Sequence, residues 1–76
     1  MTTIKLNIDR LEKIKEAEGI TSDRQLAAVL GVSHPFLSQV RNGYRGVSAL
    51  FITKMLTELR VPFNFDEGSL YRMEEE

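Results

Sequence analysis

Side chains that could carry out catalysis are scarce in this sequence of 76 residues. It contains one histidine, His34, and no cysteine. No serine–aspartate pair and no further metal ligand accompanies His34 at a recognisable spacing, so we expect no catalytic site, metal site, cofactor or small-molecule ligand. The chemistry that remains is hydrogen bonding, since His34, Ser38 and Gln39 lie in one short segment and can bind the edges of nucleic-acid bases.

The pattern in residues 23–43 predicts two short helices joined by a tight turn. Apolar residues recur at helical spacing on both sides of Gly31, so the two helices share one buried seam. Ala27 is small enough to let the two backbones approach closely at the near-perpendicular angle of a helix-turn-helix. The apolar residues of this seam are Leu26, Ala27, Leu30, Val32, Leu37 and Val40.

Capping residues set the expected ends of these two helices. Ser22 and Gln25 have the spacing of a capping box, in which each side chain satisfies the other residue's backbone N–H. Gly31 can adopt the left-handed conformation that ends the first helix. Ser33 then caps a second helix from His34 to about Asn42, in which Pro35 falls in the first turn and Phe36 packs mostly inward. Gly43 ends the second helix, giving a helix-turn-helix over residues 22–43.

The flanking segments predict two further helices. One begins at Asn7 or Asp9, carries the apolar stripe Ile8, Leu11 and Ile14, and ends at Gly19, while its charged side chains, including Glu12 and Lys15, are expected to face water. The other is capped by Ser48 and ended by Pro62, and at most one more helical turn follows near residues 63–67. Its buried side is expected to comprise Leu50 or Phe51, Met55, Leu56 and Leu59. Ile52 lies partly off this side and is expected to widen it, the alternative being exposure for a partner subunit.

The two ends of the chain alternate apolar and polar residues, which suits short strands. Thr2 to Leu6 could pair antiparallel with Ser69 to Met73, and the alternative for the first segment is a frayed terminus. Glu74 to Glu76 are expected to be disordered. The predicted fold is therefore all-α, with four to five short helices in a single domain over residues 1–76 and, if the two end segments pair, a small two-stranded sheet.

The charges are distributed unevenly along the chain. The formal net charge is −1, but residues 23–60 carry five basic and two acidic side chains, a net of +3. An acidic tail over residues 66–76 ends the chain. No apolar run approaches the roughly 20 residues that span a bilayer, and no signal segment opens the chain, so we expect a cytoplasmic protein without membrane contact.

The helix-turn-helix segment carries a resemblance to a known family. Gln25-Leu-Ala-x-x-Leu-Gly-Val-Ser33 followed by Leu37-Ser-Gln-Val-Arg-Asn-Gly43 resembles the lambda-repressor/Cro-like (XRE-type) DNA-binding domains. The resemblance runs from about residue 11 to 61. It implies a nucleoid-associated transcriptional regulator, a small repressor or Cro-like protein that binds a double-stranded operator as a homodimer. The alternative is a protein-interaction module on the same scaffold, with no DNA binding.

A helix in the major groove turns its N-terminal, solvent-facing side chains toward base edges. Gln39 can bind adenine through two hydrogen bonds, and Ser38 can donate or accept one. His34 can bond to guanine or phosphate, whereas Pro35 offers only apolar contact, for example to a thymine methyl group. The predicted base-reading residues are Ser33, His34, Pro35, Ser38 and Gln39.

The resemblance also implies phosphate contacts, which position a DNA-binding domain without reading sequence. They would lie at the start of the first helix of the pair and in the loop after the second, with Arg41 and Arg45 as the leading candidates. One departure is Asp23, where relatives often have glutamine, because a carboxylate repels phosphate. The predicted phosphate-binding residues are Ser22, Arg24, Arg41, Asn42, Tyr44, Arg45 and Ser48.

Overall fold

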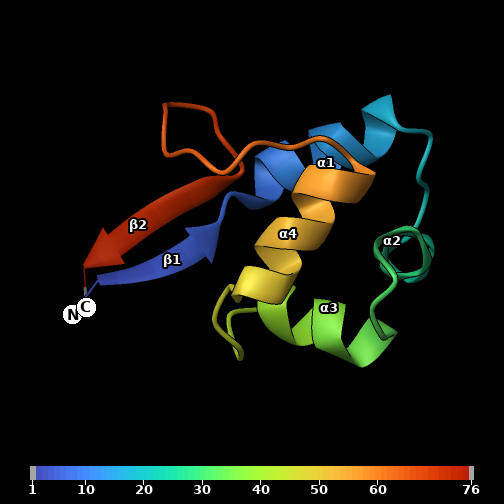
Figure 1. The fold of residues 1–76 in the computed structure, drawn as a ribbon, viewed down its shortest axis with the longest axis horizontal. Coiled ribbons are helices and arrows are strands. Elements are labelled where there is room, and N and C mark those ends of the chain that lie inside the picture. The colour runs from blue at the N-terminus through green and yellow to red at the C-terminus, as the bar shows by residue number, and fades with distance from the viewer. Residues whose placement is uncertain (1, 76) are drawn as a thin grey trace.

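The computed structural model describes residues 2–75 and contains four helices and two strands. Figure 1 shows the helices packed together and the strand pair standing out from them on one side. This arrangement confirms the predicted fold of short helices with a small sheet. The elements in chain order are β1 (Thr2–Leu6), α1 (Ile8–Ala17), α2 (Asp23–Leu30), α3 (His34–Arg41), α4 (Ala49–Glu58) and β2 (Tyr71–Glu75).

Each helix begins at a residue whose side chain accepts a hydrogen bond from the backbone N–H three residues later. This satisfies one of the N–H groups that a helix start leaves without a partner. In α2 the capping box is only half formed, because the Gln25 side chain accepts from the backbone N–H of Thr21 at 2.9 Å rather than from that of Ser22. The caps are Asn7, Ser22, Ser33 and Ser48, with acceptor distances of 3.2, 3.1, 3.2 and 3.4 Å.

The seam between α2 and α3 is buried as predicted. Gly31 ends α2 in the left-handed conformation at φ 72°, and Val32 donates its N–H to the Ala27 carbonyl at 3.0 Å, which turns the chain into α3. Phe51 and Met55 of α4 close the same core from the other side, and both are fully buried. The buried seam residues are Leu26, Ala27, Leu30, Leu37 and Val40, with Val32 partly buried beside them.

In α4 only Leu56 differs from the prediction, since the structure buries Phe51 of the two alternatives Leu50 and Phe51. Leu50 and Leu56 are about half exposed, at 52% and 50%, whereas Phe51 and Met55 are fully buried. Only one side of α4, a helix of ten residues, faces the core, so only the residues on the same side as Phe51 are buried. Ile52 is partly buried and packs against the core, which confirms its predicted place.

The strands pair antiparallel, but β2 begins two residues later than predicted, and its partners run from Thr2–Glu75 to Leu6–Tyr71. Leu70 is itself a core residue just before the strand, and its carbonyl accepts the Asn7 N–H at 2.7 Å. This bond fixes the register at the end nearest the helices. Glu74 and Glu75 therefore lie in β2 rather than in a disordered tail, while residue 76 lies outside the described range.

The segment between α4 and β2 contains no helical turn at residues 63–67, which agrees with the predicted limit of at most one. The rings of Phe63 and Phe65 meet edge to face at 5.0 Å, and Phe63 meets Tyr71 in the same way at 5.1 Å. These contacts hold an extended chain after Pro62. Tyr71 is 1% exposed, and burial raises the pKa of its phenol to about 12. In the described part of the chain, no helix has the length and apolar character needed to cross a membrane.

The close approach at Ala27 makes a prediction about stability. Ala27 is 2% exposed between α2 and α3, so Ala27→Leu should cost about 1–3 kcal/mol of unfolding free energy through overpacking. Urea denaturation measures it as a lower midpoint at unchanged m-value. The neighbouring Ala28 is exposed, so Ala28→Leu is the matched control and should stay within about 0.5 kcal/mol. Equal effects of the two substitutions would contradict the close approach.

Candidate nucleic-acid interface

Helix α3 lies along one side of the molecule (Figure 1). Its inner positions, Leu37 and Val40, are 0% and 3% exposed and hold the helix against the core. Positions 34, 35, 38 and 39 fall together on the opposite side at helical spacing. Of the predicted base-reading residues, Ser33, His34, Pro35 and Gln39 are exposed and Ser38 is half-buried.

The loop after α3 folds back onto the end of the helix. The Gln39 carbonyl accepts the backbone N–H groups of Tyr44 and Arg45 at 2.9 and 3.1 Å. Arg45 also donates from Nε to the Gln39 side-chain oxygen at 3.1 Å, and its guanidinium lies 5.2 Å from the centre of the Phe36 ring. Phe36 itself is half-buried and packs on the core, which confirms its predicted inward packing. The structure therefore joins a predicted base reader to a predicted phosphate contact.

The remaining predicted phosphate contacts surround the two helices. Arg24 and Asn42 are exposed, Tyr44 is 85% exposed, and Asn42 donates to the Ser38 hydroxyl at 3.3 Å. Ser22 and Ser48 cap α2 and α4, so their oxygens are occupied as acceptors. The hydroxyl hydrogen of a serine stays available in that state and can be donated to a phosphate oxygen.

The side chain of Arg41 forms ion pairs within the fold, so it is not available to bind a phosphate. Its Nη1 lies 2.6 and 2.5 Å from the two carboxylate oxygens of Asp23, and its Nη2 pairs with Glu12. Lys15 is 7% exposed and completes the group, at 2.7 Å from Asp23 and 3.4 Å from Glu12. These four side chains, Glu12, Lys15, Asp23 and Arg41, form an ion cluster that joins α1, α2 and α3.

The ion cluster changes the interpretation of three charged residues, Glu12, Lys15 and Asp23. Lys15 does not face water as predicted, because it is buried and pairs with Asp23 of α2. Glu12 keeps a partly exposed side chain but also pairs with Arg41 of α3. Burial alone would raise the pKa of Asp23, but the hydrogen bond from Lys15 and the charge and hydrogen bond of Arg41 outweigh it and lower that pKa below 3.8. Asp23 is therefore an ionised carboxylate that two cations neutralise, which removes most of its repulsion toward phosphate.

Two lysines that sequence reasoning missed come close to the ends of α3. A Cβ placed on Gly31, in the turn before α3, would lie 3.8 Å from Lys54 Nζ. One placed on Gly43, just after α3, would lie 3.9 Å from Lys5 Nζ. Lys54 comes from α4 and Lys5 from β1, so only the tertiary fold brings their charges to this helix, and no local sequence signal could have indicated them.

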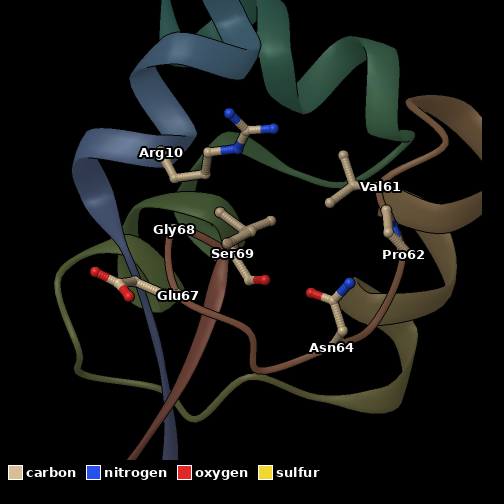
Figure 2. A pocket seen from close by; sticks show the side chains of 8 residues that line it. Arg10, Val61, Pro62, Asn64, Glu67, Gly68 and Ser69 are labelled. Atoms are coloured by element: carbon tan, nitrogen blue, oxygen red, sulfur yellow. The ribbon is translucent and has the colours of Figure 1, made fainter.

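A pocket of about 370 Å³ lies away from α3. It is lined by Arg10 of α1 and by residues of the segment that leads to β2. Figure 2 shows Arg10 above the opening with Asn64, Glu67 and Ser69 around it. Within residues 2–75, no group of three or more histidine and acidic side chains is placed to hold a metal ion.

With this geometry in place, the chain can be compared with known proteins. A helix-turn-helix family model matches residues 8–65, well over half of the sequence. The chain belongs to the Cro/C1-type (XRE) helix-turn-helix family. No curated protein and no solved structure matches it significantly.

Membership of the XRE family identifies a DNA-binding helix-turn-helix protein, and such proteins are typically transcriptional regulators and not enzymes. The matched range runs from the start of α1 to the extended segment after α4, so it covers every helix of the structure. The two strands lie outside it. The strand pair is therefore formed by segments at the two ends of the chain that the family model does not match.

The ion cluster makes a prediction about acid stability. Asp23→Asn should lower the unfolding free energy by about 2 kcal/mol at pH 7, because it leaves Lys15 and Arg41 with one shared carboxylate. The folded-state pKa of Asp23 is depressed, so its contribution is complete above the ordinary value of 3.8 and is lost as the pH falls below it. The difference between the two proteins should therefore shrink below about pH 4.

Urea denaturation at pH 7 and at pH 3 measures this difference. Glu16→Gln is the matched control, because Glu16 is an exposed carboxylate of α1 outside the ion cluster. It should change stability little at either pH. A deficit for Asp23→Asn that persists in full at pH 3 would show that the cluster does not depend on the ionised carboxylate.

Proposed function

We propose that this protein is a sequence-specific transcriptional regulator, a small repressor or Cro-like protein, that inserts α3 into the major groove of an operator as a homodimer. The observation that carries the proposal is the division of α3 into two sides. Leu37 and Val40 are buried against the core, while His34, Pro35 and Gln39 are exposed on the other side. A helix anchored in this way can enter a groove without disturbing the fold beneath it.

The charges around α3 support the proposal. Arg24 stands exposed at the start of α2, and Arg45 lies in the loop after α3. Lys54 adds positive charge near the turn before α3. Cations at these places can meet the phosphates on either side of a groove, which positions the helix and gives the salt dependence of DNA binding. The phosphate contacts we propose are Ser22, Arg24, Asn42, Tyr44, Arg45 and Ser48, and Arg41 is left out because the ion cluster occupies it.

A second copy of the chain belongs to this proposal for a physical reason. One helix reads only a few base pairs, and the formal charge of the whole chain is −1, so a single copy has a small electrostatic attraction for DNA. Two copies related by a two-fold axis would double both contributions. Such a pair would recognise two half-sites with inverted symmetry.

Selection of bound sequences from random duplex DNA tests the proposal. A palindromic consensus with half-sites about 10 base pairs apart, or a multiple of that spacing, would support sequence reading by a dimer. A consensus without symmetry would contradict the dimer. No binding to any duplex at low salt would contradict DNA binding altogether and favour a protein-interaction module instead.

Two substitutions should distinguish a residue that positions the protein on DNA from a residue that reads a base. Arg24→Ala should weaken binding to specific and random duplexes by about the same factor and reduce the slope of log affinity against log salt by about 1, because one phosphate contact is lost. Gln39→Ala should instead relax the preference at one position of the consensus. Fluorescence anisotropy at several salt concentrations measures both effects. An equal loss on specific and random DNA for Gln39→Ala would contradict base reading by this residue.

A further inference from the structure

We propose that Gln39 and Arg45 act as one recognition unit that selects guanine, with Arg45 setting the base preference of Gln39. This inference rests on the proposed function, because it assigns a base to the same side of α3. It replaces the sequence expectation that Gln39 binds adenine, and it adds a base contact to the phosphate contact proposed above for Arg45. The contacts between the two residues carry the argument.

Arg45 is fixed at three points despite being exposed. Its backbone N–H donates to the Gln39 carbonyl at 3.1 Å, its Nε–H donates to the Gln39 side-chain oxygen at 3.1 Å, and its guanidinium lies over the Phe36 ring. The Nε–H is a donor, so the atom of the Gln39 amide that faces it must be the oxygen and not the nitrogen. The side chains of Gln39 and Arg45 therefore have a defined orientation in the free protein.

This orientation leaves the unit rich in donors. An amide binds adenine through two bonds by accepting from N6 and donating to N7, so it needs its oxygen at the base edge. In this structure a charged donor holds the Gln39 oxygen, and the guanidinium beside it repels the adenine amino group. The Gln39 amide nitrogen and the two Nη groups of Arg45 remain as donors. Guanine presents two acceptors, O6 and N7, at the same edge, and it is the base that such a set of donors fits.

The unit also explains why Arg45 is more than a phosphate contact. A lone surface arginine on a flexible loop loses rotamer entropy when it binds, whereas this one is already ordered by Gln39 and Phe36. Its Nη groups have no acceptor among the residues that the structure describes. They lie next to a predicted base reader of α3, in the place where a base edge would supply the missing acceptors.

The test is a change of preferred base. Sequences are selected from random duplex DNA with the full-length wild-type chain and with Arg45→Ala. The wild type should prefer guanine at the position read by Gln39, by roughly five- to a hundredfold over adenine. In Arg45→Ala the Gln39 oxygen is released, so the preference at that position should move to adenine while the rest of the consensus stays the same.

Arg24→Ala is the control for charge, since it removes one exposed arginine that does not contact Gln39. It should lower affinity about uniformly and keep guanine at the same position. Three results would overturn the unit: adenine preferred by the wild type, guanine still preferred at that position by Arg45→Ala, or the same base change in Arg24→Ala. A wild-type chain that binds no duplex at all would overturn the proposed function, which is a different result from binding with an unchanged consensus.

Discussion

The pairing of Arg41 with Asp23 is the interaction on which the position of α3 depends. Asp23 is the first residue of α2 and Arg41 the last of α3, so their ion pair joins the far ends of the two helices. Glu12 and Lys15 extend it to α1. Partly buried charges cost free energy to desolvate, and here each one has at least two opposite charges to offset that cost. The ion cluster thus stabilises, at the ends of α2 and α3 away from the turn, the interhelical angle that the small side chain of Ala27 allows.

The side of α3 that we propose faces DNA depends on the ion cluster in turn. The chain leaves α3 at Asn42, directly after Arg41, and the loop that follows returns to α3 through the carbonyl and side chain of Gln39. A shift of Arg41 would move the start of that loop and with it Arg45. The ion cluster also cancels the one carboxylate at the start of α2. The exposed positive charge near α3 comes from Arg24 and Arg45, and Lys54 of α4 lies near the turn before α3.

Short-range sequence patterns predicted much of this fold, but they predicted few of the long-range contacts between its elements. The serine caps and the left-handed Gly31 were predictable because each depends on residues within a few positions. The ion cluster was not, since three of its four pairs lie 8, 18 and 29 residues apart and its members look like ordinary surface charges on a helix. The register of β2 was missed for a related reason. It is set by a hydrogen bond between Asn7 and Leu70, at opposite ends of the chain.

The same distinction holds for the candidate interface. The polar residues of α3 were predictable from helical spacing, because the apolar seam fixes which side they occupy. The contacts of Arg45 with Gln39 and Phe36 were not, because the path of a glycine-containing loop decides them. Two residues that the sequence assigned to separate roles therefore lie together. Only the fold shows that Arg41 and Arg45, which look alike in sequence, have different surroundings.

Chemical-shift mapping of the ¹⁵N-labelled full-length protein tests the central claim most directly. The labelled protein is titrated with a duplex that carries its selected consensus. The account predicts that the largest changes fall on the amides of residues 33–39 and 44–46 and on the Arg45 Nε–H, with small changes in β1 and β2. Largest changes on the exposed side of α4, around Leu50 and Leu56, with α3 unaffected, would contradict it.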